Sequence, residues 1–357
     1  MSAAFACGVQ NLAAGNLVKV WELDLTKWNL GRTDRFPVET VSLSPDGTLV
    51  AFTDTDGADG KKTGGRLLIA RVGVGAESVR VFQSSTGGGP PRWSPNGDYI
   101  VTGGNLVRLQ DGASCHAAGI FGFFATDHAI GRTPGRQDTS STQFTTYDVG
   151  CHAIAHWGVH GAWNIGDILA DRGLVLLNHA GMSVQVVRGE DGRVVRNAGR
   201  ADSAGDLTWA VFADQGSALC GTAIRSPAQA DDETNIRCSS TDNGALIRKV
   251  QAIGASMPIV ASPRATRVVY TEAWSLPLPG VVAGLIPGLN LHPYEGAVVW
   301  DFATGEKVAA WRPAVQAYLI EAPRHMSIRE VSKLALSQDG KSVAEAGNGR
   351  VIVYRIE

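Results

Sequence analysis

One strand–turn–strand phrase recurs along the chain, and this repetition constrains the fold more than any other feature of the sequence. Residues 41–53 read VSLSPDGTLVAFT, which is an apolar strand with alternating side chains, a tight polar turn and a second apolar strand. The same phrase returns at 92–103 (RWSPNGDYIVTG) and at 333–346 (KLALSQDGKSVAEA). Proline fixes φ at the first central turn position and glycine accepts the positive φ that closes the turn.

Weaker copies of the phrase begin at Phe123, Ile168, Val211 and Ile259. The small residue before each turn therefore marks seven corners, namely Ser44, Ser94, Ala125, Ala170, Ala213, Ser262 and Ser337. Further pairs of short apolar strands follow the corners, as at 66–72 and 78–83. This pattern predicts seven repeats of a four-stranded antiparallel unit. Such a thin sheet must stack on its neighbours to bury both of its faces.

The phrases SPDGTLVAFT and WSPNGDYIVTG, and the stretch AVVWDFATGEKVAAW with its Trp300–Asp301 dipeptide, resemble WD-repeat (WD40) β-propeller blades and the related PD40-type repeats. The resemblance covers about residues 15–357 and implies an all-β fold, a seven-bladed β-propeller of four-stranded antiparallel sheets. Because only one repeat carries the Trp-Asp dipeptide, the blades are expected to be stabilised mostly by apolar packing and less by the polar network of typical WD repeats.

The two ends of the chain suggest how such a ring would close. Residues 350–357 (RVIVYRIE) resemble the third strand of a blade with no fourth strand after it. Propellers of this family commonly take the missing strand from the other terminus, which removes a free sheet edge. We therefore expect a single propeller domain over residues 1–357, with the N-terminal segment 1–30 completing the last blade. An eight-bladed ring is the alternative, because residues 3–25 also read as a second and third strand.

Composition limits the class of partner and the compartment. The formal net charge is −2 in 357 residues, so the chain lacks the basic surplus of a nucleic-acid-binding protein. The uncharged stretch 273–294 contains four prolines, which predicts a loop and no membrane span. The sequence start has no basic, long apolar leader. Five cysteines cannot all pair, and we interpret them mainly as buried thiols, although Cys220 and Cys238 could face each other on a hairpin. A cytoplasmic location is predicted.

No motif in the sequence points to catalysis. A GxSxG elbow, an HExxH pair and a dinucleotide fingerprint after a strand are all missing, so neither an enzyme nor a bound cofactor is expected. The segment 54–60 (DTDGADG) resembles a calcium loop but lacks its final glutamate, and it is interpreted as a solvated turn.

Histidines supply the one alternative. Six of the eight histidines lie between His116 and His179, and His152, His156 and His160 recur every fourth residue. On one strand these three side chains would share a face, where imidazoles could bind zinc or copper. Gly158 and Gly161 suggest that the strand ends inside this row, so no metal site is predicted and the three histidines stay candidates. The alternative function is a propeller enzyme or metal-binding protein that uses the His116–His179 region.

The preferred function is a non-catalytic scaffold for protein–protein interaction. In the predicted register, residues 54–65, 132–142, 225–235 and 274–296 connect second and third strands and project from one rim. The resemblance implies that this rim and the channel mouth bind a protein or peptide. The fourth segment is apolar and would form either a docking knob or part of the core. The residues of this predicted knob are Leu276, Leu278, Val281, Val282, Leu285, Ile286 and Leu289.

Overall fold

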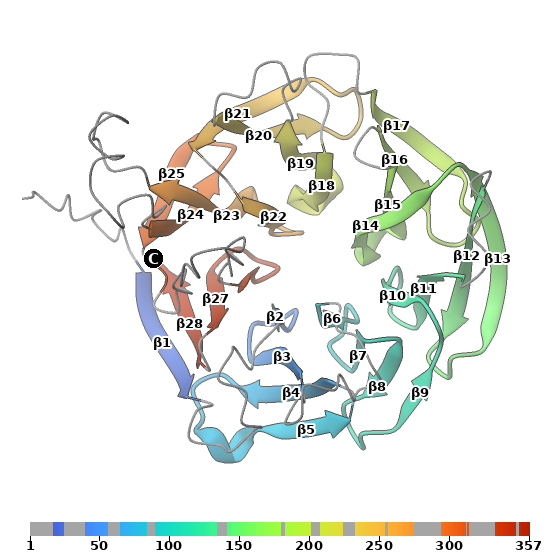
Figure 1. Ribbon diagram of the computed structural model, residues 1–357, viewed down its shortest axis with the longest axis horizontal. Helices are drawn as coiled ribbons and strands as arrows, with labels where there is room; N and C mark the ends of the chain where they lie inside the picture. The colour runs from blue at the N-terminus through green and yellow to red at the C-terminus, as the bar shows by residue number, and fades with distance from the viewer. Residues whose placement is uncertain are drawn as a thin grey trace, which may run out of the picture.

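Seven four-stranded antiparallel sheets stand as blades around a central axis (Figure 1). The structure is a computed structural model that describes residues 17–24, 40–55, 65–83, 90–133, 141–179, 183–200, 208–223, 233–253, 256–274, 294–311, 313, 333–347 and 350–357. These residues form strands, turns and three short 3-10 helices, with no α-helix among them. The predicted seven-bladed β-propeller is confirmed, and the eight-bladed alternative is wrong.

Blades 1 to 3 follow in chain order. Blade 1 consists of β2 (Thr40–Leu43), β3 (Leu49–Thr55), β4 (Gly65–Arg71) and β5 (Arg80–Gln83), with the 3-10 helix η2 (Ala76–Ser78) before β5. Blade 2 consists of β6 (Arg92–Trp93), β7 (Tyr99–Thr102), β8 (Asn105–Arg108) and β9 (Ser114–His116). Blade 3 consists of β10 (Ile120–Phe123), β11 (His128–Arg132), β12 (Ser141–Asp148) and β13 (Ala153–His160).

Blades 4 to 6 repeat the same order. Blade 4 consists of β14 (Trp163–Leu169), β15 (Leu174–His179), β16 (Ser183–Arg188) and β17 (Val194–Arg200), with η3 (Ala170–Arg172) after β14. Blade 5 consists of β18 (Thr208–Ala213), β19 (Ala218–Ala223), β20 (Glu233–Ser240) and β21 (Leu246–Ile253), with η4 (Asp214–Gly216) after β18. Blade 6 consists of β22 (Ser256–Ala261), β23 (Arg267–Trp274), β24 (Tyr294–Asp301) and β25 (Glu306–Trp311).

Blade 7 joins the two ends of the chain. It consists of β26 (Lys333–Leu336), β27 (Ser342–Gly347), β28 (Arg350–Ile356) and β1 (Leu17–Asp24). β1 runs antiparallel to β28, from the pair Leu17 and Ile356 to the pair Asp24 and Arg350. Hydrogen bonds between strands, rather than a turn, therefore complete this blade.

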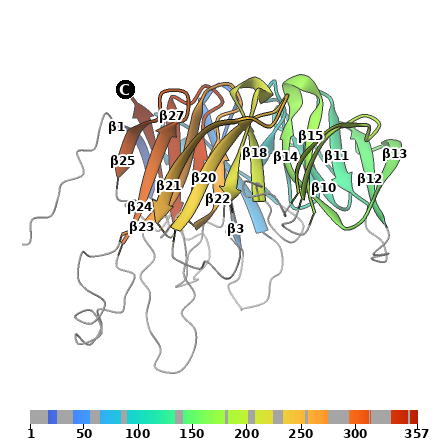
Figure 2. The same ribbon diagram turned by 90° about the horizontal axis from the view of Figure 1, so that it is seen from above.

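The first strand of each blade lies nearest the axis and the fourth lies at the outside of the disc (Figures 1 and 2). Because the strands alternate in direction, the turns after the first and third strands lie on one face of the disc, which we call the turn face. The connections between second and third strands attach at the opposite face. Residues 54–65, 132–142, 225–235 and 274–296 include such connections in blades 1, 3, 5 and 6.

The recurring corner has a shared hydrogen-bond pattern. The hydroxyl of the fully buried Ser94 donates to Asn96 Oδ1 at 2.7 Å and accepts from the backbone N–H of Tyr99 at 3.0 Å. Gly97 follows with a φ of 79°. The corners at Ser44 and Ser337 repeat this arrangement with Asp46 and Asp339 as the acceptors. The hydroxyl of the corner serine thus makes this arrangement at three of the seven sites, and the buried Ser262 hydroxyl donates instead to the Gln338 carbonyl.

Apolar packing lies between blades. The buried apolar residues of the described chain fall into clusters that each join two neighbouring blades. For example, Ile100 of blade 2 packs with Leu67 of blade 1, and Phe212 of blade 5 packs with Leu176 of blade 4. Trp300, from the single Trp-Asp dipeptide, is 1% exposed in the cluster between blades 5 and 6.

Polar contacts add a second connection between blades near the outside of the ring. A side chain on the outer strand of one blade donates to backbone carbonyl groups at the third-to-fourth-strand turn of the next, at 2.5 to 3.2 Å, and we call these contacts the outer latches. The outer latches are Trp21 to Val74, Arg80 to Leu109, Trp157 to Gly189, Arg196 to Ser240, and Arg248 to Phe302 and Ala303. These hydrogen bonds supplement the apolar packing between blades.

The junction between blades 6 and 7 uses a buried carboxylate instead. Glu345 of β27 is fully buried and accepts hydrogen bonds from Trp311 Nε1 at 2.8 Å and from the Tyr354 hydroxyl at 3.0 Å. Burial raises the pKa of Tyr354, and the nearby Glu345 carboxylate raises it further. Tyr354 therefore stays protonated and acts as a donor throughout the neutral range.

Four of the five cysteines form disulfides. Cys220 and Cys238 are directly opposite on β19 and β20 and are bonded, with Cα atoms 4.1 Å apart. Cys115 of blade 2 is bonded to Cys151 of blade 3, with Cα atoms 5.9 Å apart. The expectation of buried thiols is wrong for these four residues, and Cys7 lies outside the described part of the chain.

Replacing the corner serine tests the hydrogen-bond pattern of the turn. Ser94→Ala leaves the buried Tyr99 N–H without its hydroxyl acceptor, which costs about 1–3 kcal/mol of unfolding free energy. Urea denaturation followed by circular dichroism measures the change. Ser114→Ala, at an exposed position on β9, is the matched control and is expected to stay near the wild-type value. Equal midpoints for the two variants would contradict the assigned role of Ser94.

Acid unfolding tests the charge of the corner aspartate. Partial burial acts to raise the pKa of Asp46, but hydrogen bonds from the Ser44 hydroxyl and from Thr48 outweigh it and hold the pKa below 3.8. The ionised group therefore stabilises the fold above the unfolded-state pKa, and this contribution is lost as the pH falls through 3.8 towards the folded pKa. Asp46→Asn is expected to lose less stability than wild type between pH 5 and pH 3, measured as urea midpoints. Equal losses of stability in wild type and Asp46→Asn over this pH range would contradict a stabilising charge at Asp46.

Candidate functional site

The inner strands enclose a cavity of about 450 Å³ along the central channel. Residues of all seven blades line it, and blades 3 and 5 contribute one each, Phe123 and Val211. Most of the wall is apolar, as at Val41, Val211 and Leu334. The volume is within the range of ligand pockets, which is about 300–1,000 Å³. The channel cavity is therefore a candidate binding site.

One ion pair crosses this apolar wall. Arg92 of β6 places Nη1 3.6 Å from Oδ1 of Asp167 on β14, so the pair joins blades 2 and 4. The Arg92 guanidinium carbon lies 4.0 Å above the centroid of the Phe121 ring in blade 3. Oδ2 of Asp167 accepts the backbone N–H of Phe212, in blade 5, at 2.8 Å. Two side chains thus connect four consecutive blades at the axis.

Local backbone features make room for this pair. β14 changes register between Ile165 and Asp167, and this bulge turns the aspartate towards the axis. Gly122 lies beneath the arginine, and a Cβ added there would be 2.9 Å from Arg92 Cδ and 3.2 Å from Ile168 Cδ1. A glycine at position 122 therefore allows Arg92 to cross blade 3.

The channel environment shifts the pKa values of both partners. Burial lowers the pKa of Arg92 and raises the pKa of Asp167, while the attraction between the two charges opposes both shifts. About a quarter of each side chain still faces the channel, at 26% and 22% exposure. The pair is therefore desolvated yet open to a group that enters the cavity.

Two further polar atoms at the channel wall are buried without a hydrogen-bond partner among the described residues. They are the indole N–H of Trp93, a donor, and the side-chain oxygen of Gln338, an acceptor. Buried polar groups are normally paired, because an unpaired one costs free energy.

A second ion pair lies where the channel meets the turn face. Arg264, in the first turn of blade 6, contacts Asp171, in the first turn of blade 4, with Nη2 to Oδ2 at 2.8 Å. Backbone bonds from Gln215 to Pro263 and from Arg264 to Gln338 join the turns of blades 5, 6 and 7. These contacts fix four of the turns that surround this mouth of the channel.

The candidate metal residues do not converge. His156 and His160 are exposed on the outer strand β13, and His152 lies just before it. His152 Nδ1 lies 3.0 Å from Asp148 Oδ2, and His156 Nδ1 lies 3.0 Å from Thr145 Oγ1. Four residues along a strand span about 13 Å, whereas zinc needs each ligand atom within about 2.1 Å. The strand does not end inside the row, because β13 continues through Gly158 to His160.

The other histidines of the His116–His179 region are distributed over different blades. His116 contacts Asn105 in blade 2, His128 contacts Asp127 in blade 3, and His179 lies against the Trp163 ring in blade 4. Among the described residues, no group of three or more His, Cys, Asp and Glu side chains is placed to hold a metal ion.

The predicted docking knob lies outside the described residues, as do the centres of all four rim segments. No helix in the part of the chain that the structure describes is long and apolar enough to cross a membrane. The sequence pattern did not single out Arg92, Trp93 or Asp167. Arg92 and Trp93 stand inside the recurring phrase, but nothing local indicates which of its side chains faces the axis.

Comparison with known proteins agrees with the fold. The structure is similar to the β-propeller domain of Cps50 (Swd1) from Myceliophteria thermophila, with a TM-score of 0.57 and 12% sequence identity over 90% of this chain and 97% of that chain. No protein-family model and no curated protein matches the sequence. The likeness concerns the fold, and the chain has the propeller architecture of WD40-type proteins, as the sequence resemblance predicts.

Removing one member of the channel ion pair is expected to destabilise the ring. Arg92→Met leaves the partly desolvated Asp167 carboxylate without its partner. Because the pair is still about a quarter exposed, the expected loss is about 1–3 kcal/mol of unfolding free energy. The double variant Arg92→Met/Asp167→Asn removes both charges, keeps a side-chain oxygen for the Phe212 N–H, and is expected to recover part of that loss. Urea unfolding of the single and double variants measures the difference. A double variant less stable than the single one would contradict the pairing.

Proposed function

We propose that this WD40-type propeller is a non-catalytic scaffold that binds a peptide or protein segment at its central channel and the surrounding rim. The observation that carries the proposal is the channel cavity of about 450 Å³, whose largely apolar wall contains one partly exposed ion pair. WD40-type folds commonly act as protein-interaction scaffolds, and fold alone does not define a function.

The chemistry of the wall favours a peptide over a small polar metabolite. Apolar side chains such as Val211 and Leu334 suit an apolar side chain of the partner, because burying it removes apolar surface from water. The Arg92–Asp167 pair is about a quarter exposed, so its guanidinium suits a backbone carbonyl and its carboxylate suits a backbone N–H of an extended peptide.

An enzymatic or metal-dependent function is the weaker hypothesis. It depends on the His116–His179 region, whose described histidines contact partners in three separate blades. A row of exposed imidazoles on an outer strand offers no enclosed space for a substrate. Neither a cofactor nor nucleic acid is part of the proposed function.

A cytoplasmic location and a single domain over residues 1–357 stay predictions. The location was predicted partly from cysteines expected to be reduced. The two disulfides weigh against it, because such bonds persist mainly in oxidising compartments.

Filling the channel tests the proposed binding site. Affinity capture with the full chain from its source cells, followed by mass spectrometry, first identifies a partner, and binding is then measured with the purified partner. Val211→Trp places an indole in the channel and is expected to weaken binding at least about tenfold, or 1.4 kcal/mol. Val81→Trp, on the outer strand at 45% exposure, is the matched control and should bind like wild type.

Circular dichroism and thermal melting establish that both variants are folded. A folded Val211→Trp variant with wild-type affinity would contradict channel binding. Deleting residues 276–291 then tests the predicted docking knob. Unchanged melting with lost binding supports the knob, whereas a fall of many degrees shows that this segment belongs to the core.

A further inference from the structure

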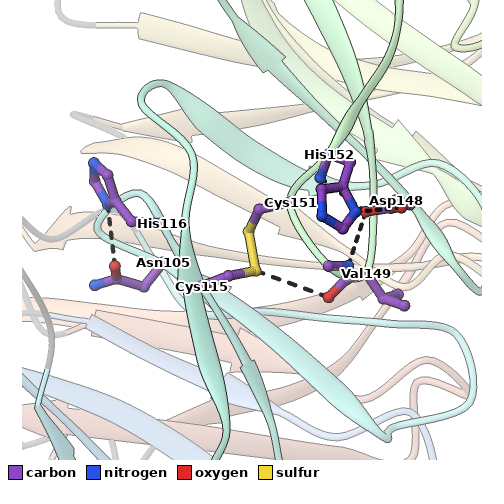
Figure 3. Close-up of a disulfide and its surroundings, with 8 residues drawn as sticks. Asn105, Cys115, His116, Asp148, Val149, Cys151 and His152 are labelled. Carbon is purple, nitrogen blue, oxygen red and sulfur yellow. Dashed lines mark hydrogen bonds and ion pairs between the residues drawn. A yellow bond between two sulfur atoms is a disulfide. The ribbon is translucent and has the colours of Figure 1, made fainter.

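The junction between blades 2 and 3 differs from its neighbours in how its outer edge is held. At five of the other six junctions a long Trp or Arg side chain of one blade donates to a turn carbonyl of the next. Here Cys115 of β9 is joined covalently to Cys151, in the turn that precedes β13 (Figure 3). Cys115 Sγ also lies 3.8 Å from the Val149 carbonyl of the same turn. The disulfide thus occupies the place of an outer latch.

In the turn of blade 3, the cysteine that forms the bond has a backbone conformation that favours glycine. The matching turns of blades 2, 4, 5 and 6 each place a glycine at positive φ beneath a side chain of the preceding blade. These glycines are Gly112, Gly192, Gly244 and Gly305. In blade 3 the corresponding residue is Cys151, with a φ of 63°. Residues other than glycine, asparagine and aspartate rarely adopt this conformation. A cysteine at a position that suits glycine indicates that its sulfur is needed.

The two disulfides differ in access. Cys220 and Cys238 are fully buried in the cluster between blades 5 and 6. Cys115 and Cys151 are only partly buried, at the outer edge of the ring. Exchange requires a thiolate to reach one sulfur of the bond. The Cys115–Cys151 disulfide can therefore exchange in the folded protein, whereas the Cys220–Cys238 disulfide can exchange only after unfolding.

The same junction has the means to stay folded without the bond. An apolar cluster that includes Val101, Leu106 and Ile120 holds blades 2 and 3 together nearer the axis. A cavity of about 380 Å³, lined in part by His116 and Phe121, lies where the chain passes from blade 2 into blade 3. Opening the disulfide would thus free the outer edge of the junction while the inner contacts persist.

We propose that Cys115 and Cys151 form a thiol–disulfide exchange site for a dithiol protein, and that this site opens and closes the outer edge of the junction between blades 2 and 3 in the folded ring. A thiolate of the dithiol attacks one sulfur and forms a mixed disulfide, and its second thiolate releases the chain. Two electrons and two protons pass to Cys115 and Cys151, and the dithiol becomes a disulfide. A protein disulfide oxidant closes the bond by the reverse steps. The proposal does not depend on what the channel binds.

Graded reduction of the full chain tests the exchange site, with dithiothreitol as the first probe and a purified thioredoxin-type dithiol protein as the second. After each step, free thiols are alkylated and the cysteine peptides are quantified by mass spectrometry. Both probes are expected to cause complete loss of the Cys115–Cys151 bond while Cys220–Cys238 stays intact and the far-ultraviolet circular dichroism is unchanged. Hydrogen exchange should then rise at residues 114–116 and 149–152 and stay constant at the turn 241–245.

A matched variant isolates the contribution of the bond. Cys115→Ser/Cys151→Gly gives the turn of blade 3 the glycine that its neighbours have, and it should show the fast hydrogen exchange of reduced wild type with no response to either probe. The proposal would be overturned if both disulfides were lost together. It would also be overturned if the Cys115–Cys151 bond were lost only when the circular dichroism signal collapses. Reduction that leaves hydrogen exchange at 149–152 unchanged, or a bond that dithiothreitol opens but the dithiol protein does not, would overturn it as well.

Discussion

Packing between neighbouring blades is the constraint on which the rest of this structure depends. A four-stranded sheet has two faces and cannot bury either one alone, so each cluster of buried residues is shared by two blades. Blades that radiate from an axis also diverge towards the outside, where small apolar side chains no longer reach across. The outer latches connect the blades there, because Trp and Arg side chains are long enough to bridge the wider gap. At blades 2 and 3 the short strand β9 and the turn before β13 approach closely enough for a disulfide.

The repeated corner explains why so much of the fold could be predicted from sequence. Its turn residues act locally, so Pro45, Asp46 and Gly47 define a hairpin whatever surrounds them. The strands that follow were recognisable from their alternating apolar residues, although β13 continues through Gly158 where an end was expected. The number of blades followed from counting corners. The sequence identified the corner serines only as small residues before the turns. The role of their hydroxyls could not be predicted, because it depends on hydrogen bonds to the turn.

Features that depend on contact between distant segments could not be predicted in this way. Arg92 and Asp167 belong to different blades, and no local pattern pairs them. The Cys115–Cys151 bond likewise joins two blades, whereas Cys220 and Cys238 could be matched because they face each other within one hairpin. The outer latches could not be predicted either, because each joins two blades. In a sequence, an arginine on a strand normally indicates a solvated side chain. At the axis, Arg92 and Asp167 both stabilise the ring and line the candidate site, so rigidity and recognition share the same residues.

The way β1 completes the last blade sets an order of events during synthesis. Leu17 pairs with Ile356, so β1 is synthesised long before β28 and cannot form these hydrogen bonds until β28 has been made. Until then β1 presents unpaired backbone groups, and the earlier blades stack as an open arc whose two outermost faces are uncovered. A nascent chain in this state could accept β28 from another copy as readily as its own, giving an exchanged dimer. Trp21, which donates to the Val74 carbonyl of blade 1, tethers the waiting strand beside the first blade and so raises the local concentration of the correct partner.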